Sequence, residues 1–391
     1  MKPIRLRYLT HFCCTLDMTL SIVVFAAINL LASEAFSQTN ANGSAIAPRT
    51  ISKNLLTDER AKEVEAAIDK GLVFLTRQQR PEGTFLQSPI GEPGVSGLCL
   101  MAFMSRGHLP GRGLYAEQLN KTVMFILNSQ QNDGLISRQR DRLCSQYNHG
   151  ISALALSELY GMSEPADEGK FRKVIEQAIV FTGQHYPQPK AHPDDAGSWR
   201  YLIPRGASTG DLSVTSWNVM FLRSAKNSGF EVDPKLVEDA IAYMKRLYDP
   251  DRKTFRYEIH TDDPGHNHTR GMAGAGVLSM SLAGEHHSEQ AVNAARYILK
   301  KPFDQFARPI PGEQFPSYAA FYCSHGLFQM GGEYWDEFYP QLVNTLLEDQ
   351  RADGSWVMTE GREAQFGPVY VTSLAILALT PPYQMLPIFQ R

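Results

Sequence analysis

Titratable residues gather most densely in the stretch EIHTDDPGHNHTR, which runs from Glu258 to Arg270. Imidazoles and carboxylates are the side chains from which zinc and other divalent ions take their ligands in proteins. The candidate metal ligands here are His260, His266 and His268, alone or with Asp262 and Asp263. Their spacing matches no established metal motif, and no bound cofactor is predicted. The alternative is a solvated loop in which Asn267 or Thr269 caps the next helix.

A second acidic group, His192-Pro193-Asp194-Asp195, leads directly into Gly197-Ser198-Trp199. Two neighbouring carboxylates can share a proton and serve as acid and base. Residues adjacent in a turn point in different directions, however, so a structural turn is the alternative interpretation.

Other polar side chains stand where long apolar segments begin. The candidates for moving protons are His149, Asp211, His268 and Tyr318. Five further side chains are expected to line the same cavity: Asn148, Ser213, Arg270, Tyr322 and Tyr370. Asp211 also has a simpler possible role, the N-cap of a helix.

The segments that must position these residues are helices of two kinds. One kind has a charged stripe and an apolar stripe, as in EVEAAIDKGLVFLTRQQ and LVEDAIAYMKRLY. The other kind is apolar nearly all round and rich in small residues, as in VSGLCLMAFM and VYVTSLAILALT. A helix without a polar face must be buried, so the alternation predicts six buried helices within six surface helices. Strand signals are weak throughout.

The two ends of this array decide whether it is open or closed. The last buried segment, Val371 to Leu379, is as apolar as the middle ones, so no polar capping repeat is visible. We therefore predict an all-α fold in which the helices close into an α6/α6 toroid. If the six inner helices are parallel, their N-termini meet at one mouth of the ring and favour anionic or oxygen-rich ligands there.

A short motif recurs between the helices. It is spelled QQRPEGTF, QQNDGLI, DDAGSW and DQRADGSW, with glycines at 83, 134, 197 and 354. The glycine supplies a left-handed turn and the aromatic residue covers apolar surface, so a packing role is expected. Because the motif recurs with each helix pair, it belongs to the architecture and not to a binding site.

The Q-x3-G-x-W signature in paired helices resembles the terpenoid cyclases and protein prenyltransferases over about residues 58 to 380. The resemblance implies an α/α toroid, a fold shared with complement thioester domains, and says less about activity. It also implies particular site residues, which are only partly present. The D-x-D-D-T acid motif of squalene-hopene cyclases corresponds to DLSVT here, where Ser213 and Val214 replace two aspartates. A serine hydroxyl cannot protonate an alkene.

The other activities implied by the resemblance also lack key residues. Ser317 stands where the zinc-binding cysteine of prenyltransferases is expected, and no histidine lies beside Tyr370. Pro311 precedes Gly312-Glu313-Gln314 where a thioester domain has its cysteine, so no thioester can form.

The N-terminus reads as an export signal. Basic residues precede an apolar run from Met18 to Ala32, and small residues follow it. We expect a signal peptide over residues 1–37, a flexible leader over 38–57 and the toroid domain over 58–391, with the protein exported to the periplasm or the extracellular space. An uncleaved membrane anchor is the alternative.

Charge and cysteine content narrow the function classes. Residues 1–37 hold three basic and two acidic residues, so the rest has 35 basic and 39 acidic residues and a net charge of −4. Such a balance argues against nucleic-acid binding. Three cysteines remain, Cys99, Cys144 and Cys323, and a disulfide framework is not expected.

Two function classes remain. One is a toroid with incomplete catalytic motifs that binds an isoprenoid, another lipid or a partner protein in its central cavity. The other is an exported enzyme, resembling a terpenoid cyclase or acting on carbohydrate as a lyase or hydrolase, that uses histidine, aspartate and tyrosine for proton transfer at the toroid mouth.

Overall fold

A computed structural model describes residues 55–85, 89–162, 168–186, 189–202, 209–261, 267–308, 310 and 312–391. The expected signal peptide and most of the expected leader lie outside these ranges, as do Asp262, Asp263, His266 and Pro311. None of the described helices is long and apolar enough to span a membrane.

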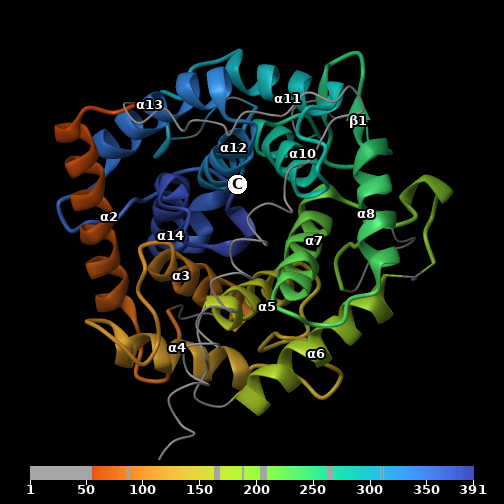
Figure 1. Ribbon diagram of the computed structural model, residues 1–391, viewed down its shortest axis with the longest axis horizontal. Coiled ribbons are helices and arrows are strands. Elements are labelled where there is room, and N and C mark those ends of the chain that lie inside the picture. Colours follow the sequence, from red (N-terminus) through yellow and green to blue (C-terminus); the bar gives the residue numbers. More distant parts are fainter. Residues whose placement is uncertain are drawn as a thin grey trace, which may run out of the picture. The chain divides into compact units, whose positions relative to one another are not determined.

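Six helices that are buried nearly all round form an inner ring (Figure 1). They are α3 (Gly94–Met104), α5 (Ser145–Met162), α7 (Leu212–Asn227), α10 (Arg270–Leu282), α12 (Pro316–Met330) and α14 (Gly367–Leu379). Small residues at their contacts let the backbones approach closely. A Cβ at Gly274 of α10, for example, would stand 2.6 Å from the backbone nitrogen of Cys323 in α12.

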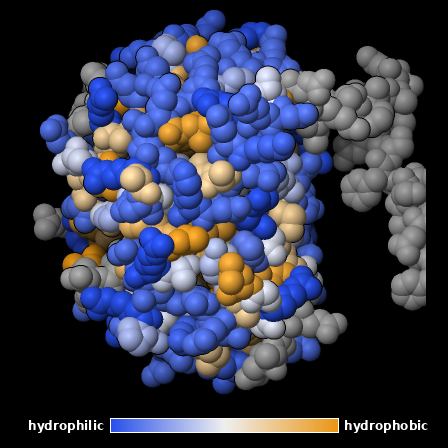
Figure 2. All heavy atoms as spheres, turned by 90° about the vertical axis from the view of Figure 1, so that its left-hand side faces the viewer, coloured by the Kyte–Doolittle hydropathy of each residue, from blue (hydrophilic) through white to orange (hydrophobic). Residues whose placement is uncertain are grey.

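Six amphipathic helices surround the inner ring and turn their apolar stripes toward it. They are α2 (Asp58–Gln78), α4 (Ala116–Asn128), α6 (Glu168–His185), α8 (Pro234–Arg246), α11 (Glu289–Leu299) and α13 (Gly332–Asp349). Figure 2 shows the side of α2, where the surface is mostly hydrophilic with scattered hydrophobic side chains.

Both rings are closed. The last inner helix, α14, packs against the first, α3, and the last outer helix, α13, packs against α2 (Figure 1). The predicted all-α, α6/α6 toroid is confirmed. Strands in the described residues are limited to a small antiparallel hairpin of β1 (Tyr248–Asp249) and β2 (Thr254–Phe255).

The inner helices run parallel, because first turns meet first turns around the ring. Gly94 at the start of α3 lies against Asn148 near the start of α5, and Gly271 of α10 lies against Tyr318 of α12. All six N-termini therefore point to one mouth of the toroid.

The four motif glycines share one geometry. Each has φ between +90° and +95°, the left-handed region that favours glycine. A Cβ on any of them would stand 2.2–2.3 Å from a backbone carbonyl oxygen of an outer helix. Gly354, for example, touches the Lys70 carbonyl of α2. Gly354 lies in the turn five residues beyond the end of α13, where its left-handed conformation lets the turn pack against α2.

The motif glutamines bind the next outer helix. The Gln350 amide after α13 donates to the Ala67 carbonyl of α2 at 2.8 Å, across the closure of the outer ring. The Gln130 amide after α4 donates to the Val174 carbonyl of α6 at the same distance. The Trp356 indole is fully buried and donates to the Leu346 carbonyl at 2.7 Å. These contacts give the motif a structural role.

Candidate functional site

Asp211 is the N-cap of inner helix α7 and has no exposed surface. Its Oδ1 accepts the backbone N–H of Val214 at 2.7 Å and the hydroxyl of Ser213 at 2.8 Å. Burial raises the pKa of the Asp211 carboxyl, and the nearby Arg200 guanidinium opposes that rise. The expected N-cap role is therefore present together with a carboxyl whose protonation is perturbed.

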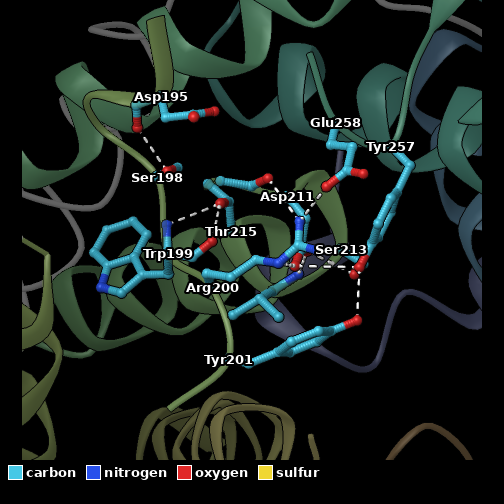
Figure 3. A network of polar contacts seen from close by, with 12 residues as sticks. Asp195, Ser198, Trp199, Arg200, Tyr201, Asp211, Ser213, Thr215, Tyr257 and Glu258 are labelled. Atoms are coloured by element: carbon cyan, nitrogen blue, oxygen red, sulfur yellow. Dashed lines mark hydrogen bonds and ion pairs between the residues drawn. The ribbon is translucent and has the colours of Figure 1, made fainter. Parts of the chain in front are cut away.

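Arg200 lies between two carboxylates (Figure 3). Its Nη1 donates to Glu258 at 2.6 Å, and its Nε lies 3.5 Å from Asp211 Oδ2. Burial opposes the charge of Arg200, but the adjacent Asp211, Tyr257 and Glu258 more than offset this and raise its pKa. One buried guanidinium thus faces two carboxylates, Asp211 and Glu258.

Two chains of hydroxyl groups lead away from Asp211. In the first, Ser213 bonds Asp211, and the Tyr147 hydroxyl lies 2.6 Å from Ser213 Oγ. In the second, the Tyr257 hydroxyl lies 3.4 Å from Asp211 Oδ2, and the Tyr201 hydroxyl lies 2.8 Å from that of Tyr257 (Figure 3). Tyr147 and Tyr201 are half-buried, and their ring centroids are 6.5 Å apart. A fully buried acid is thereby connected to two phenols at the mouth.

A second group of tyrosines stands beside this network. The rings of Tyr318 and Tyr322 are 4.6 Å apart, and the Tyr322 hydroxyl lies 2.9 Å from Ser216 Oγ of α7. Burial raises the pKa of Tyr318, and the nearby Tyr322, Tyr147 and Tyr370 add to the rise. The structure thus brings together five of the residues expected at the mouth, Asp211, Ser213, Tyr318, Tyr322 and Tyr370.

His149 and Asn148 do not join this group. The His149 ring is fully buried between α5 and α6, where Nδ1 accepts the Ile136 N–H at 3.1 Å and Nε2 lies 2.9 Å from Thr182 Oγ1. Burial lowers its pKa to about 3, so the imidazole is neutral. The Asn148 amide donates to the Ile90 carbonyl at 2.8 Å. Both side chains hold the start of α5 in place.

His268 and Arg270 also lie away from Asp211. His268 Nε2 is 2.9 Å from Asp249 Oδ2, at the small hairpin beside the outer ring. Arg270 donates to the Pro302 carbonyl at 3.2 Å, and its guanidinium lies 4.8 Å from the Phe303 ring centroid. The cavity-lining position expected for Arg270 is therefore wrong. Thr269, between the two, caps α10, as the alternative interpretation of this stretch predicted.

The metal candidates are dispersed. The His260 ring stacks on His192 with centroids 3.8 Å apart, and its Nε2 lies 3.5 Å from the buried Asp195 carboxylate. His268 pairs separately with Asp249, and His266 is outside the described residues. Within the described ranges, no three side chains of the metal-binding types are arranged to hold an ion.

The mouth does not offer free helix N-termini to an anion, because the protein's own carboxylates occupy them. Glu363, which is fully buried, accepts the N–H groups of Ser317 and Tyr318 at the start of α12. Four other carboxylates accept N–H groups in the same way at α3, α5, α7 and α10, namely Glu92, Asp141, Asp211 and Glu313. The expectation that helix dipoles select an anionic ligand is therefore wrong for these five helices.

The centre of the ring is filled by side chains. Trp217 of α7 stacks on Phe321 of α12 with ring centroids 5.4 Å apart, and Tyr322 lies across the indole. From the opposite end, Phe389, close to the C-terminus, stacks on His325 at 3.9 Å. Their exposed fractions are 0–3%. Among the described residues, these side chains form a packed aromatic cluster inside the ring, and the polar site lies at the mouth.

A surface hollow of about 460 Å³ lies elsewhere, over the outer helix α4. Its lining includes Lys121, Met124, Phe125 and Arg138. It contains none of the hydroxyl chains described above.

Comparisons with known proteins agree with the toroid. No family model and no curated protein matches the sequence. The type II terpene cyclase MstE from Scytonema, solved with geranylgeranyl dihydroxybenzoate, is 13% identical with a TM-score of 0.58, covering 85% of this chain and 100% of that one. Unsaturated glucuronyl hydrolase from Bacillus sp. GL1 is 14% identical with a TM-score of 0.57, covering 82% and 96%.

A further similar structure is a possible member of the GH105 family from Klebsiella pneumoniae. It is 10% identical with a TM-score of 0.54, covering 89% of this chain and 97% of that one. At these identities the similarities establish the fold, and they leave the activity to be argued from the site.

Proposed function

We propose that the protein is an enzyme that transfers protons at the toroid mouth, with a carbohydrate as its substrate. The observation that carries this proposal is the chain from Tyr147 through Ser213 to Asp211, with oxygen–oxygen distances of 2.6 and 2.8 Å. Its inner end is a buried carboxyl with a raised pKa, and its outer end is a half-buried phenol. Strongly perturbed acids joined to accessible groups are typical of acid–base sites.

The Tyr147–Ser213–Asp211 chain allows a proton to be taken from the substrate without forming a free Tyr147 phenolate. As Tyr147 takes a proton from the substrate, it passes its own to Ser213, and Ser213 passes its own to Asp211. The reverse sequence returns the proton to a product. Burial strongly raises the pKa of Tyr147 and would oppose a phenolate, so a concerted transfer fits this environment better than stepwise ionisation.

The choice of carbohydrate over isoprenoid rests on the packing of the ring. Trp217, Phe321, Tyr322 and Phe389 occupy the centre, where a long apolar chain would have to bind. The site above them presents hydroxyl groups and aromatic rings, which suit a hydroxyl-rich ligand. Glucuronyl hydrolases with a similar fold support the assignment by analogy. Binding of a long apolar ligand inside the ring is therefore not favoured.

A substrate panel tests this function. Purified protein is incubated with polysaccharides and, separately, with polyprenyl compounds, and the products are identified by mass spectrometry. We expect turnover of at least one polysaccharide, and we expect Tyr147→Phe to abolish it. Tyr297→Phe is the control, because the Tyr297 hydroxyl donates to the His268 carbonyl at 2.7 Å, away from both hydroxyl chains. Turnover confined to polyprenyl compounds, or equal turnover by wild type and Tyr147→Phe, would disprove the proposal.

We also propose that the protein is exported, on the basis of the basic residues and the apolar run from Met18 to Ala32. N-terminal sequencing of protein recovered from the periplasm or the culture medium tests this. A first residue near Gln38 is expected, and recovery of only uncleaved cytoplasmic protein would contradict it.

A further inference from the structure

Arg142 stands in the turn just before α5, five residues ahead of Tyr147. Its guanidinium carbon lies 5.8 Å from the centroid of the Tyr201 ring, at the outer end of the second hydroxyl chain. Arg142 is therefore next to the Tyr201 phenol, whose ring lies 6.5 Å from that of Tyr147.

The Arg142 guanidinium has no anionic partner among the described residues. Its Nε is buried, and no described residue supplies it with a hydrogen-bond acceptor. The neighbouring Asp141 carboxylate is occupied, since it accepts the N–H groups of Leu143 and Cys144 at the start of α5 at 2.9 and 2.6 Å. A guanidinium that is partly withdrawn from water and lacks an acceptor is costly, so an acceptor from outside the chain is expected.

Arg200, by contrast, is a guanidinium beside the same ring whose charge is paired within the protein. It also lies over the Tyr201 ring, at 4.8 Å, but it is held by Glu258 and Asp211. Tyr201 therefore lies near two cations, of which one is neutralised within the protein. The other, Arg142, is available to a ligand that reaches the Tyr147 and Tyr201 hydroxyls.

We propose that Arg142 binds a carboxylate of the substrate, so that the carbohydrate of the proposed function, on which this inference rests, is a uronate. A planar guanidinium presents paired N–H donors that match the two oxygens of a carboxylate. The Tyr201 ring lies within cation–π distance of the guanidinium, and this contact favours its position before a ligand binds. At five of the six inner helices the N-terminus already has one of the protein's own carboxylates as a partner, so these termini are less suited to bind the substrate carboxylate.

Calorimetric titration tests the inference without requiring turnover. The probes are trisaccharides of galacturonate, glucuronate and mannuronate, their carboxyl-reduced neutral counterparts, and a sulfated neutral trisaccharide. We expect at least one uronate to bind at least tenfold more tightly than its neutral counterpart. Arg142→Ala should remove that difference, and Arg142→Lys should restore only part of it, because lysine lacks the paired donors.

The matched control is Arg138→Ala. Arg138 also stacks on an aromatic ring, 5.5 Å from the Phe125 centroid over the surface hollow of α4, and its removal should leave uronate binding unchanged. Circular dichroism establishes that each variant is folded.

Three results would overturn the inference: no uronate preferred over its neutral counterpart, a preference that survives Arg142→Ala, or preference for the sulfated probe over every uronate. Failure of the proposed function is a separate result. Uronate binding that depends on Arg142, without turnover of any carbohydrate, would disprove catalysis but would still support the carboxylate site.

Discussion

Tyr147 and Ser213 lie on neighbouring inner helices, α5 and α7, and their hydroxyl oxygens are 2.6 Å apart. Ser213 bonds the buried Asp211 carboxylate in turn. A contact between helices thus links a half-buried phenol to an acid that the solvent does not reach. The link depends on a single serine hydroxyl, which alanine would remove.

Replacing Ser213 by alanine should break the proton path while leaving the helix cap. Asp211 would still accept the Val214 N–H, so α7 should keep its N-terminus. We expect kcat to fall by about 10²-fold or more, the range of a lost acid–base contribution, with a smaller change in KM.

The control for this prediction is Ser324→Ala, which removes another buried serine hydroxyl from an inner helix. Ser324 donates to the Ala378 carbonyl, outside the hydroxyl chains. If Ser213→Ala and Ser324→Ala reduce kcat equally, Ser213 has a packing role and not a relay role.

Asp211 caps α7 and is proposed to accept a proton, and two substitutions separate these roles. Asparagine keeps an acceptor for the Val214 N–H, whereas alanine removes it at a cost of about 1 kcal/mol. Both remove the acid, so both should lose activity to a similar extent. Urea denaturation should show the larger stability loss for Asp211→Ala.

Thr269→Ala is the matched capping control. It removes the side chain that accepts the Met272 N–H at the start of α10, so it should lower stability by about the same 1 kcal/mol while activity is retained. Full activity in Asp211→Asn would show that the carboxyl carries no proton in the reaction.

The architecture could be predicted because it depends on patterns that are local and repeated. Helices such as α3 and α14 are apolar on every side, and a helix of that kind has to be enclosed. Closure of the ring was predicted because the last buried segment has no polar face. In the structure this segment is α14, which packs against α3. The small hairpin at Tyr248–Phe255 was not predicted, since two-residue strands carry almost no periodic signal.

The site was predicted only in part, and His149 shows the reason. His149 and Tyr147 are two positions apart, which on a helix means nearly opposite faces. Asn148 and His149 were expected where an inner helix begins, and α5 begins at Ser145, but the Tyr147 phenol faces the mouth and the His149 imidazole faces α6. In a sequence, a histidine is readily selected as a candidate catalytic residue, whereas a tyrosine on an apolar helix is not.

Arg200, Tyr257 and Glu258 were missed for a different reason. They come from turns outside the inner helices, and Tyr257 and Glu258 are 46 and 58 residues from their partners Asp211 and Arg200. No spacing rule connects residues so far apart in sequence. The sequence did offer a signal for Arg200, because this residue directly follows Trp199 of the recurrent motif.

The motif glycines provide a prediction about stability. Gly354→Ala places a Cβ 2.3 Å from the Lys70 carbonyl oxygen and also forces a left-handed conformation, at φ +90°. The conformation alone costs about 1–2 kcal/mol, and the clash with backbone adds to it. Gly229→Ala is the control, because Gly229 has φ +84° and a Cβ added there would meet no atom within 4 Å among the described residues.

Thermal denaturation of the two variants measures the difference. Gly354→Ala should lose clearly more stability than Gly229→Ala. If both lose the same amount, the close contact with α2 contributes nothing beyond the backbone conformation.

Buried glutamates make the stability of the protein depend on pH. Burial raises the pKa of Glu158 to about 7 from its ordinary 4.5, although the Ser224 hydroxyl and the Ile388 N–H both bond its carboxylate. The folded state holds this proton more tightly than the unfolded state, so protonation of Glu158 stabilises the folded protein. This stabilisation is complete below pH 4.5. The contribution is lost as pH rises through about 7, and it is on the order of 3 kcal/mol.

Glu158→Gln tests this directly, because glutamine reproduces the protonated acid: its carbonyl can accept the Ile388 N–H and its amide can donate to Ser224. Urea denaturation should give nearly equal stabilities for wild type and variant at pH 4.5. At pH 8 the variant should be more stable, and Glu231→Gln, at an exposed position, should show no such divergence. A constant difference between wild type and Glu158→Gln across this range would mean that Glu158 does not titrate between the two states.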